Sequence, residues 1–229
     1  MIKSYKIRLY PTKEQEALMW KHIGACRYIW NYMLAYQEEQ YANGEKHLSA
    51  FDMIKLLTPL KKDGEHEWLC EVSNASLGVV CRDLDKAYKG FFKKIARFQA
   101  EHPEREYAYI QFDVRRFKYI NEKYGSDTGD NILRYIYDTL DVMCDKEHLH
   151  CRLSADVFQI VTYYNSREEI MEFIDKLDEK IRRYGDIKLS ITYGVNIVPG
   201  SSTAYRKHGD EAGLARAEGK RTILNKVVF

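Results

Sequence analysis

The pattern of apolar residues changes at Pro103, and this change constrains the fold of the 229-residue chain more than any other feature. Beyond Pro103, short apolar runs typical of strands alternate with stretches of helical spacing. The predicted elements, in order, are strand 107–112, helix 117–140, strands 151–153 and 157–163, helix 167–184, strand 189–198, helix 208–217 and strand 223–229. This order predicts an elaborated ferredoxin-like β-α-β-β-α-β core, in which helices pack on a sheet.

Before Pro103 the pattern is helical. A short strand is predicted at 3–9, followed by a helix that begins at Thr12, which can cap it, and stops at Asn43-Gly44. A second helix fits 49–62, although Pro59 must kink or shorten it, and a third fits 73–100. The predicted fold class is therefore α+β: a helical N-terminal segment with one short strand, then an α/β sandwich.

Composition and charge bear on the location of the protein, the state of its cysteines and its contact with nucleic acid. The sequence contains no run of about 18 apolar residues and no apolar stretch of the signal-peptide kind at its start, so we expect a cytoplasmic protein without membrane contact. The five cysteines include no C-x-x-C pair, which predicts buried, reduced thiols. Residues 1–97 carry 16 Lys and Arg against 12 Asp and Glu, a basic excess that permits contact with nucleic acid.

Four stretches of the second half carry a motif. They are FDVRRFKYIN at 112–121, YGSDTGD at 124–130, RLSADVF at 152–158 and SITYGV at 190–195. Together they resemble the GGDEF (diguanylate cyclase-type) domain. Enzymes of that family join two GTP molecules into cyclic di-GMP with metal ions, so the resemblance implies a guanine nucleotide as ligand and Mg²⁺ as cofactor. It also implies that two such domains face each other, as a homo- or heterodimer.

The resemblance assigns roles to individual residues. Asp113 and Asp156 match metal ligands, since hard divalent cations prefer carboxylate oxygens. Asn121 and Asp130 match the pair that reads guanine, and Phe117 and Lys118 belong to the same nucleotide-binding element. Taken singly, Asp130 could be a helix cap and Asn121 a turn residue.

The signature turn itself has changed. Ser154 and Ala155 replace two glycines, and Val157 replaces a glutamate that could bind a metal or accept a proton; Asp156 and Phe158 are kept. Arg115 replaces a second acidic residue, which would oppose a metal ion. We therefore expect no catalytic residue, weakened Mg²⁺ binding and a cyclase rate that is lower by several orders of magnitude. Asp145 and His148 stand at the family's R-x-x-D product site, so product binding there is not expected.

The first half carries a different resemblance. KIRLYPT at 6–12, GACRYIWN at 24–31 and RDLDKAY at 82–88 resemble the N-terminal region of TnpB/OrfB-type transposon-encoded RNA-guided nucleases. That region contacts RNA and DNA, and the resemblance suggests phosphate contacts for four residues: Arg8, Arg27, Lys86 and Lys89. The alternative is that Arg27 and Lys86 are ordinary solvated charges. Beyond residue 94 the sequence shows no match to the nuclease carboxylates or to a zinc ribbon.

These observations predict two domains, a TnpB/OrfB-like segment at 1–94 and a degenerate GGDEF domain at 95–229. The leading hypothesis is a guanine-nucleotide-binding or regulatory protein of cyclic di-GMP signalling. One alternative is a nucleic-acid-binding remnant of a transposon nuclease, without nuclease activity. Another is a cyclase with residual activity in a heterodimer, and a further one is a rearrangement product without function.

Overall fold

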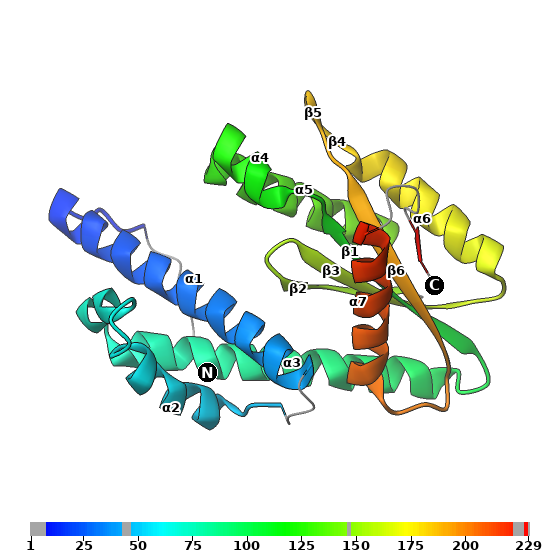
Figure 1. Cartoon of the computed structure of the whole chain (residues 1–229), viewed down its shortest axis with the longest axis horizontal. Coiled ribbons are helices and arrows are strands. Elements are labelled where there is room, and N and C mark those ends of the chain that lie inside the picture. The colour runs from blue at the N-terminus through cyan, green and yellow to red at the C-terminus, as the bar shows by residue number, and fades with distance from the viewer. Residues whose placement is uncertain (1–7, 43–46, 146–147, 222–226, 229) are drawn as a thin grey trace. The chain divides into compact units, whose positions relative to one another are not determined.

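The computed structural model of the protein describes residues 8–42, 47–145, 148–221 and 227–228 (Figure 1). The chain divides into two compact units, Met1–Tyr88 and Lys89–Phe229. The division falls within one long helix, α3 (Asn74–Glu101). Each unit has its own hydrophobic core, and each is described separately below.

The first unit is helical. It contains α1 (Lys13–Ala42), α2 (Ala50–Leu60), a 3₁₀ helix at Glu67–Glu71 and the first half of α3. A capping box begins α1: the Thr12 amide donates to Gln15 Oε1 at 3.0 Å, and the Gln15 amide donates to Thr12 Oγ1 at 3.3 Å. Apolar side chains from all of these helices form the core, among them Ile29, Met33, Met53, Leu57, Leu69, Leu77 and Leu84.

Two sequence predictions for this unit lie partly or wholly outside the described residues. Of the predicted strand 3–9, only Arg8 and Leu9 are described, and neither lies in a strand. The predicted stop at Asn43-Gly44 is not described at all. The predicted helix 49–62 is α2, which contains Pro59 and ends at Leu60, two residues before the predicted end.

The second unit is built on a five-stranded sheet in the order β2-β3-β1-β6-β7. All pairings are antiparallel except that of β6 with β7. The strands are β1 (Glu106–Val114), β2 (His148–Ser154), β3 (Val157–Tyr164), β6 (Ile191–Pro199) and β7 (Val227–Val228). The order of the first four strands along the sheet is that of the ferredoxin-like fold, so the predicted topology is confirmed.

Helices cover both faces of this sheet. On one face α4 (Phe117–Tyr124), α5 (Ser126–Met143) and α6 (Arg167–Ile181) cover the larger core, which includes Ile110, Phe112, Phe158, Ile132, Ile136 and Ile174. On the other face, residues of α3 and of α7 (Tyr205–Arg221) join a smaller core with Tyr107, Tyr109, Val161 and Val198. Alternate residues of β1 therefore enter different cores, as the strand pleat requires.

Two local features differ from the prediction. The helical stretch 117–140 is interrupted at Gly125, whose φ of 89° is a conformation that glycine adopts readily, and so it forms two helices. The predicted helix 167–184 ends at Ile181, and the chain then forms a small hairpin of β4 (Arg183–Tyr184) and β5 (Ile187–Lys188). Within the described ranges, no helix is long and apolar enough to cross a membrane.

Candidate nucleotide site

Asp113 lies near the end of β1, between one residue of each neighbouring strand. In the antiparallel ladders it is paired with Val157 of β3 and with Thr192 of β6. Directly paired residues point to the same face, so the three side chains form a row. By its resemblance to the GGDEF signature, Val157 replaces a glutamate. In this register, a glutamate at position 157 would lie beside Asp113 and supply a second carboxylate. Val157 supplies none.

The row is covered by α7, and Arg216 of this helix is paired with Asp113. Arg216 Nη1 donates to Asp113 Oδ2 at 2.6 Å. The Asp113 side chain is 1% exposed and that of Arg216 is 18% exposed, so the ion pair is largely buried. Charge-assisted hydrogen bonds of this length are among the stronger ones in proteins.

α7 can come so close to the sheet because Gly194 of β6 has no side chain. A Cβ atom at this position would lie 2.1 Å from the Ala212 carbonyl oxygen and 2.1 Å from the Arg216 backbone nitrogen. Figure 1 shows α7 crossing the sheet at β6. The glycine thus fixes the position of α7, and with it the reach of Arg216 to Asp113.

Further polar contacts hold α7 on this face. Gln111, one step along β1 from Asp113 on the same face, donates through Nε2 to the Gly209 carbonyl at 2.7 Å and to Gln159 Oε1 at 3.1 Å. Arg115 Nη2 donates to the Gly219 carbonyl at 3.0 Å, near the C-terminal end of α7. The face around Asp113 is therefore buried but polar, and it contains two arginine contacts.

The stretch 154–158, which the sequence matched to the signature, forms the turn between β2 and β3. Ala155 has a φ of 25°, so it keeps a backbone conformation that favours glycine, and its carbonyl accepts from Arg152 Nε at 2.7 Å. Ser154 ends β2, and Asp156 is half-buried in the turn. Phe158 is fully buried and stacks on Phe112 with the ring centroids 5.3 Å apart, so the last signature residue belongs to the core.

The predicted guanine-reading residues come from α4 and α5, which meet at Gly129. Asn121 Oδ1 lies against this glycine: a Cβ atom on Gly129 would be 1.8 Å from it and 3.2 Å from the Phe117 ring. Asn121 Oδ1 is buried and has no hydrogen-bond partner among the described residues. The structure therefore brings Asn121 and Phe117 beside Gly129 and the adjoining Asp130. Lys118 is 91% exposed and its Nζ lies 3.9 Å from Glu122 Oε1.

The four predicted nucleic-acid contacts lie in three parts of the chain: before α1, within α1 and on α3. Arg8 precedes α1 and its guanidinium lies 5.3 Å from the Tyr10 ring centroid, and Arg27 lies within α1. Lys86 and Lys89 lie one turn apart on α3, on either side of the division between the units. All four side chains are exposed.

The residues around Asp113 do not fit a divalent cation. One Asp113 oxygen is bonded to a guanidinium, and the neighbours across the sheet are valine and threonine. Among the residues that the structure describes, no three His, Cys, Asp or Glu side chains are grouped as a metal site. The family's cofactor therefore has no matching set of ligands in this part of the chain.

Sequence reasoning missed Arg216, Gln111 and Gln159. The two glutamines gave a signal, because each lies directly between two large apolar residues of its strand. Arg216 gave none, since a charged residue in a polar helix is ordinary. Its contact with Asp113 depends on where α7 lies on the sheet.

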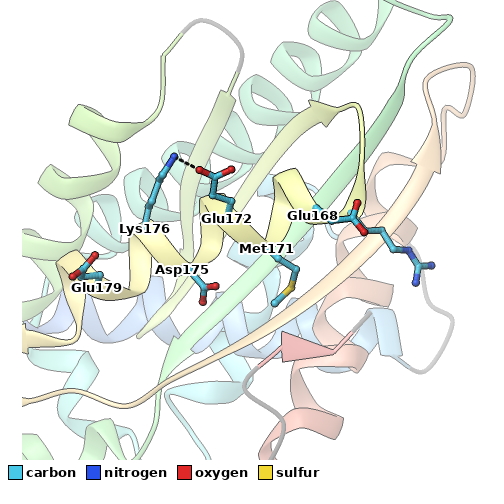
Figure 2. Close-up of a pocket in the computed structure, with 7 residues that line it drawn as sticks. Glu168, Met171, Glu172, Asp175, Lys176 and Glu179 are labelled. Atoms are coloured by element: carbon cyan, nitrogen blue, oxygen red, sulfur yellow. Dashed lines mark ion pairs between the residues drawn. The ribbon is translucent and has the colours of Figure 1, made fainter.

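A hollow lies elsewhere, on the surface of α6 (Figure 2). It has a volume of about 510 Å³ and is lined by one face of the helix: Arg167, Glu168, Met171, Glu172, Asp175, Lys176 and Glu179. Lys176 Nζ pairs with Glu172 Oε1 at 2.7 Å, as Figure 2 shows. It contains none of the candidate site residues, and we regard it as a solvated helix face.

Comparison with known proteins decides the family of the second unit. A family model described as diguanylate cyclase, GGDEF domain, matches residues 88–225. The chain belongs to the GGDEF family. A second model, described as a helix-turn-helix domain of the OrfB type, matches residues 1–46, so this GGDEF protein has a transposon-protein-like N-terminal segment.

Two curated relatives match different halves of this GGDEF protein. InsQ of Escherichia coli (strain K12), named as a candidate RNA-guided DNA endonuclease, is 35% identical over 97 residues, which are 42% of this chain and 24% of InsQ. Diguanylate cyclase VdcA of Vibrio cholerae is 28% identical over 131 residues, 53% of this chain and 37% of VdcA. The chain thus spans about a quarter of the length of InsQ and a little over a third of the length of VdcA.

Solved GGDEF domains share the fold of the second unit. The active GGEEF domain of a Vibrio cholerae diguanylate cyclase is similar with a TM-score of 0.54 at 17% identity, covering 61% of this chain and 94% of that one. The GGDEF domain of PA1120 from Pseudomonas aeruginosa gives 0.53 at 22% identity, covering 63% and 94%. At such identities the likeness concerns the fold alone.

Proposed function

We propose that the GGDEF unit binds a guanine nucleotide without carrying out metal-dependent condensation, and that the protein serves a regulatory or interaction role in cyclic di-GMP signalling. The observation that carries the proposal is the buried, unpartnered Oδ1 of Asn121 beside Gly129 and Asp130. A buried polar atom without a partner costs free energy, and a ligand that supplies a donor removes that cost.

Guanine offers the chemistry that this pair can read. A carboxylate such as that of Asp130 accepts from the N1 and N2 hydrogens of guanine, and adenine does not present these two donors together. The amide of Asn121 can both donate and accept. A site that pairs specific polar groups of its ligand rejects an analogue lacking them, because its own groups are then left unpaired.

The loss of condensation is supported by the row at the end of β1. Phosphoryl-transfer enzymes stabilise the charge on the attacked phosphate with metal ions held by carboxylates. Here Asp113 is bonded to Arg216, and its partner across the ladder is Val157. The nucleotide would therefore be held by its base and by protein donors, so that Mg²⁺ is not required.

Isothermal titration with GTP, once with Mg²⁺ and once with EDTA, tests the proposal on the full chain. We expect binding in both conditions and no cyclic di-GMP. Asn121→Ala should weaken binding by about 1–3 kcal/mol, the usual cost of losing a buried hydrogen bond. Asn131→Ala is the matched control, because Asn131 is an exposed residue of α5 next to Asp130 and should leave the affinity unchanged.

Gly129→Ala gives a second readout. The new Cβ would force the Asn121 side chain to turn away, so GTP affinity should fall while the fold is kept. ATP should bind at least about tenfold more weakly than GTP, a difference of about 1.4 kcal/mol. No heat from GTP at millimolar concentration, in either condition, would contradict the proposal.

Binding of nucleic acid by the first unit is a second candidate. It is favoured by the helix-turn-helix match at 1–46 and by the exposed Arg8, Arg27, Lys86 and Lys89. Phosphate contacts release counterions, so the affinity for structured RNA or duplex DNA should fall steeply as salt rises. A gel shift that is absent, or that does not depend on salt, would remove this candidate.

A further inference from the structure

We propose that Arg216 acts as a built-in cation that keeps a divalent metal ion away from the Asp113 carboxylate. The geometry points to this role because the guanidinium is bonded to Asp113 Oδ2 at 2.6 Å inside a nearly closed site. A metal ligand atom lies about 2.1 Å from Mg²⁺, so the ion and the guanidinium would compete for the same space on the carboxylate.

The backbone of α7 at Arg216 is held close to the sheet. α7 lies directly on Gly194 at this residue, since a Cβ atom there would be 2.1 Å from the Arg216 nitrogen. Two contacts flank this point along α7, from Gln111 to the Gly209 carbonyl and from Arg115 to the Gly219 carbonyl. The helix is therefore tied to the sheet on both sides of the arginine.

The charge balance of the row leads to the same conclusion. Asp113 is flanked across the ladders by Val157 and Thr192, both uncharged, and the positive charge of the Arg216 guanidinium lies on its carboxylate. A divalent cation bound here would share the one carboxylate with a guanidinium, and the two positive charges would repel each other. Restoring a carboxylate at position 157 would add a negative charge, but the Arg216 guanidinium would still occupy Asp113 Oδ2.

According to this proposal, two features prevent metal binding at Asp113: the guanidinium of Arg216 and the absence of a glutamate at position 157. The proposal can be tested on the full chain with Mn²⁺, which suits carboxylate ligands and whose free form is measured by electron paramagnetic resonance. Four proteins are compared: wild type, Val157→Glu, Arg216→Gln, and the double variant Val157→Glu/Arg216→Gln. Binding is counted only if a further Asp113→Asn change removes it, which excludes Mn²⁺ on surface carboxylates.

We expect no Asp113-dependent Mn²⁺ binding in wild type or in Val157→Glu. The double variant should bind at least about tenfold more tightly than Val157→Glu, equivalent to about 1.4 kcal/mol. Val157→Glu/Arg134→Gln is the matched control, since it removes an exposed arginine of α5 instead and should behave like Val157→Glu.

Two results would overturn the proposal. One is Mn²⁺ binding by Val157→Glu as tight as that of the double variant, because Arg216 would then be no barrier. The other is a folded double variant that binds no Mn²⁺. If the double variant is unfolded in metal-free buffer, Mn²⁺ must restore its circular dichroism, and failure to do so also overturns the proposal. GTP is not used here, so the result is independent of guanine binding.

Discussion

At the scale of single residues, Asp113 shows that a partner from a distant helix sets the surroundings of a motif residue. Its carboxylate stands in its expected place at the end of β1, but it is bonded to Arg216. Removing one partner of a buried ion pair typically costs about 3–5 kcal/mol, because the other charge is left buried and uncompensated. Asp113 and Arg216 therefore depend on each other, and either one alone would destabilise the unit.

The cysteines give a prediction at the same scale. Burial raises the pKa of Cys81 to about 11. Burial, helped by the Asp145 and Asp141 carboxylates, raises that of Cys144 to about 12. Burial also raises the pKa of Cys26 and of Cys151, whereas Cys70 is exposed. Since the thiolate is the reactive form, we expect a thiol reagent at pH 8 to modify Cys70 quickly and the other four slowly.

Mass spectrometry after timed alkylation measures this directly. Cys70→Ser should remove the fast phase, and unfolding in guanidinium should make all five thiols of the wild type reactive. The slow reactions should speed up as the pH approaches the raised pKa values of Cys81 and Cys144. Equal rates for all five thiols in the folded protein would contradict the burial that the structure assigns.

At the scale of elements, α7 is unusual because polar contacts fix it to the sheet. Ala212 is its buried apolar residue, while Leu214 is 71% exposed. Asn196 of β6 donates to the His208 carbonyl at 3.2 Å and to Glu211 Oε2 at 2.7 Å, in addition to the contacts of Gln111, Arg115 and Asp113. Such hydrogen bonds are directional, so they fix the register of the helix more narrowly than apolar packing would.

Gly194 is the position at which this docking can be tested. Gly194→Ala would place a Cβ atom 2.1 Å from backbone atoms of α7, which must move. We expect the free energy of unfolding to fall by about 1–3 kcal/mol or more, the usual cost of overpacking. The measurement is urea denaturation.

Gly90→Ala in α3 is the matched control. A Cβ atom at Gly90 meets nothing within 4 Å, so alanine should stabilise the helix by about 0.5–1 kcal/mol. Gly194→Ala with wild-type stability would mean that α7 does not lie where the structure has it.

At the scale of the whole molecule, the chain has two units with separate hydrophobic cores. A protein of this kind need not unfold in one step. We expect calorimetry to give a van't Hoff enthalpy smaller than the calorimetric one. Leu77 and Ile136 are both fully buried, one in the core of each unit. Replacing either by alanine should cost about 2–5 kcal/mol and lower one transition only.

A single transition that moves by the same amount in Leu77→Ala and in Ile136→Ala would show that the chain unfolds as one cooperative body. A conservative change at an exposed residue, such as Lys118→Gln on α4, serves as the control and should shift neither transition.

The sequence by itself determined the order of the main helices and strands of the second unit, and hence the ferredoxin-like topology, because hydrophobic spacing records which face of each element is buried. It also determined the cap of α1 at Thr12, since its hydrogen-bond partner Gln15 lies within one turn. Only the tertiary structure decided the surroundings of Asp113. Arg216 is 103 residues away, and no local spacing specifies which helix side chain reaches which strand residue. That choice is made where α7 docks on Gly194.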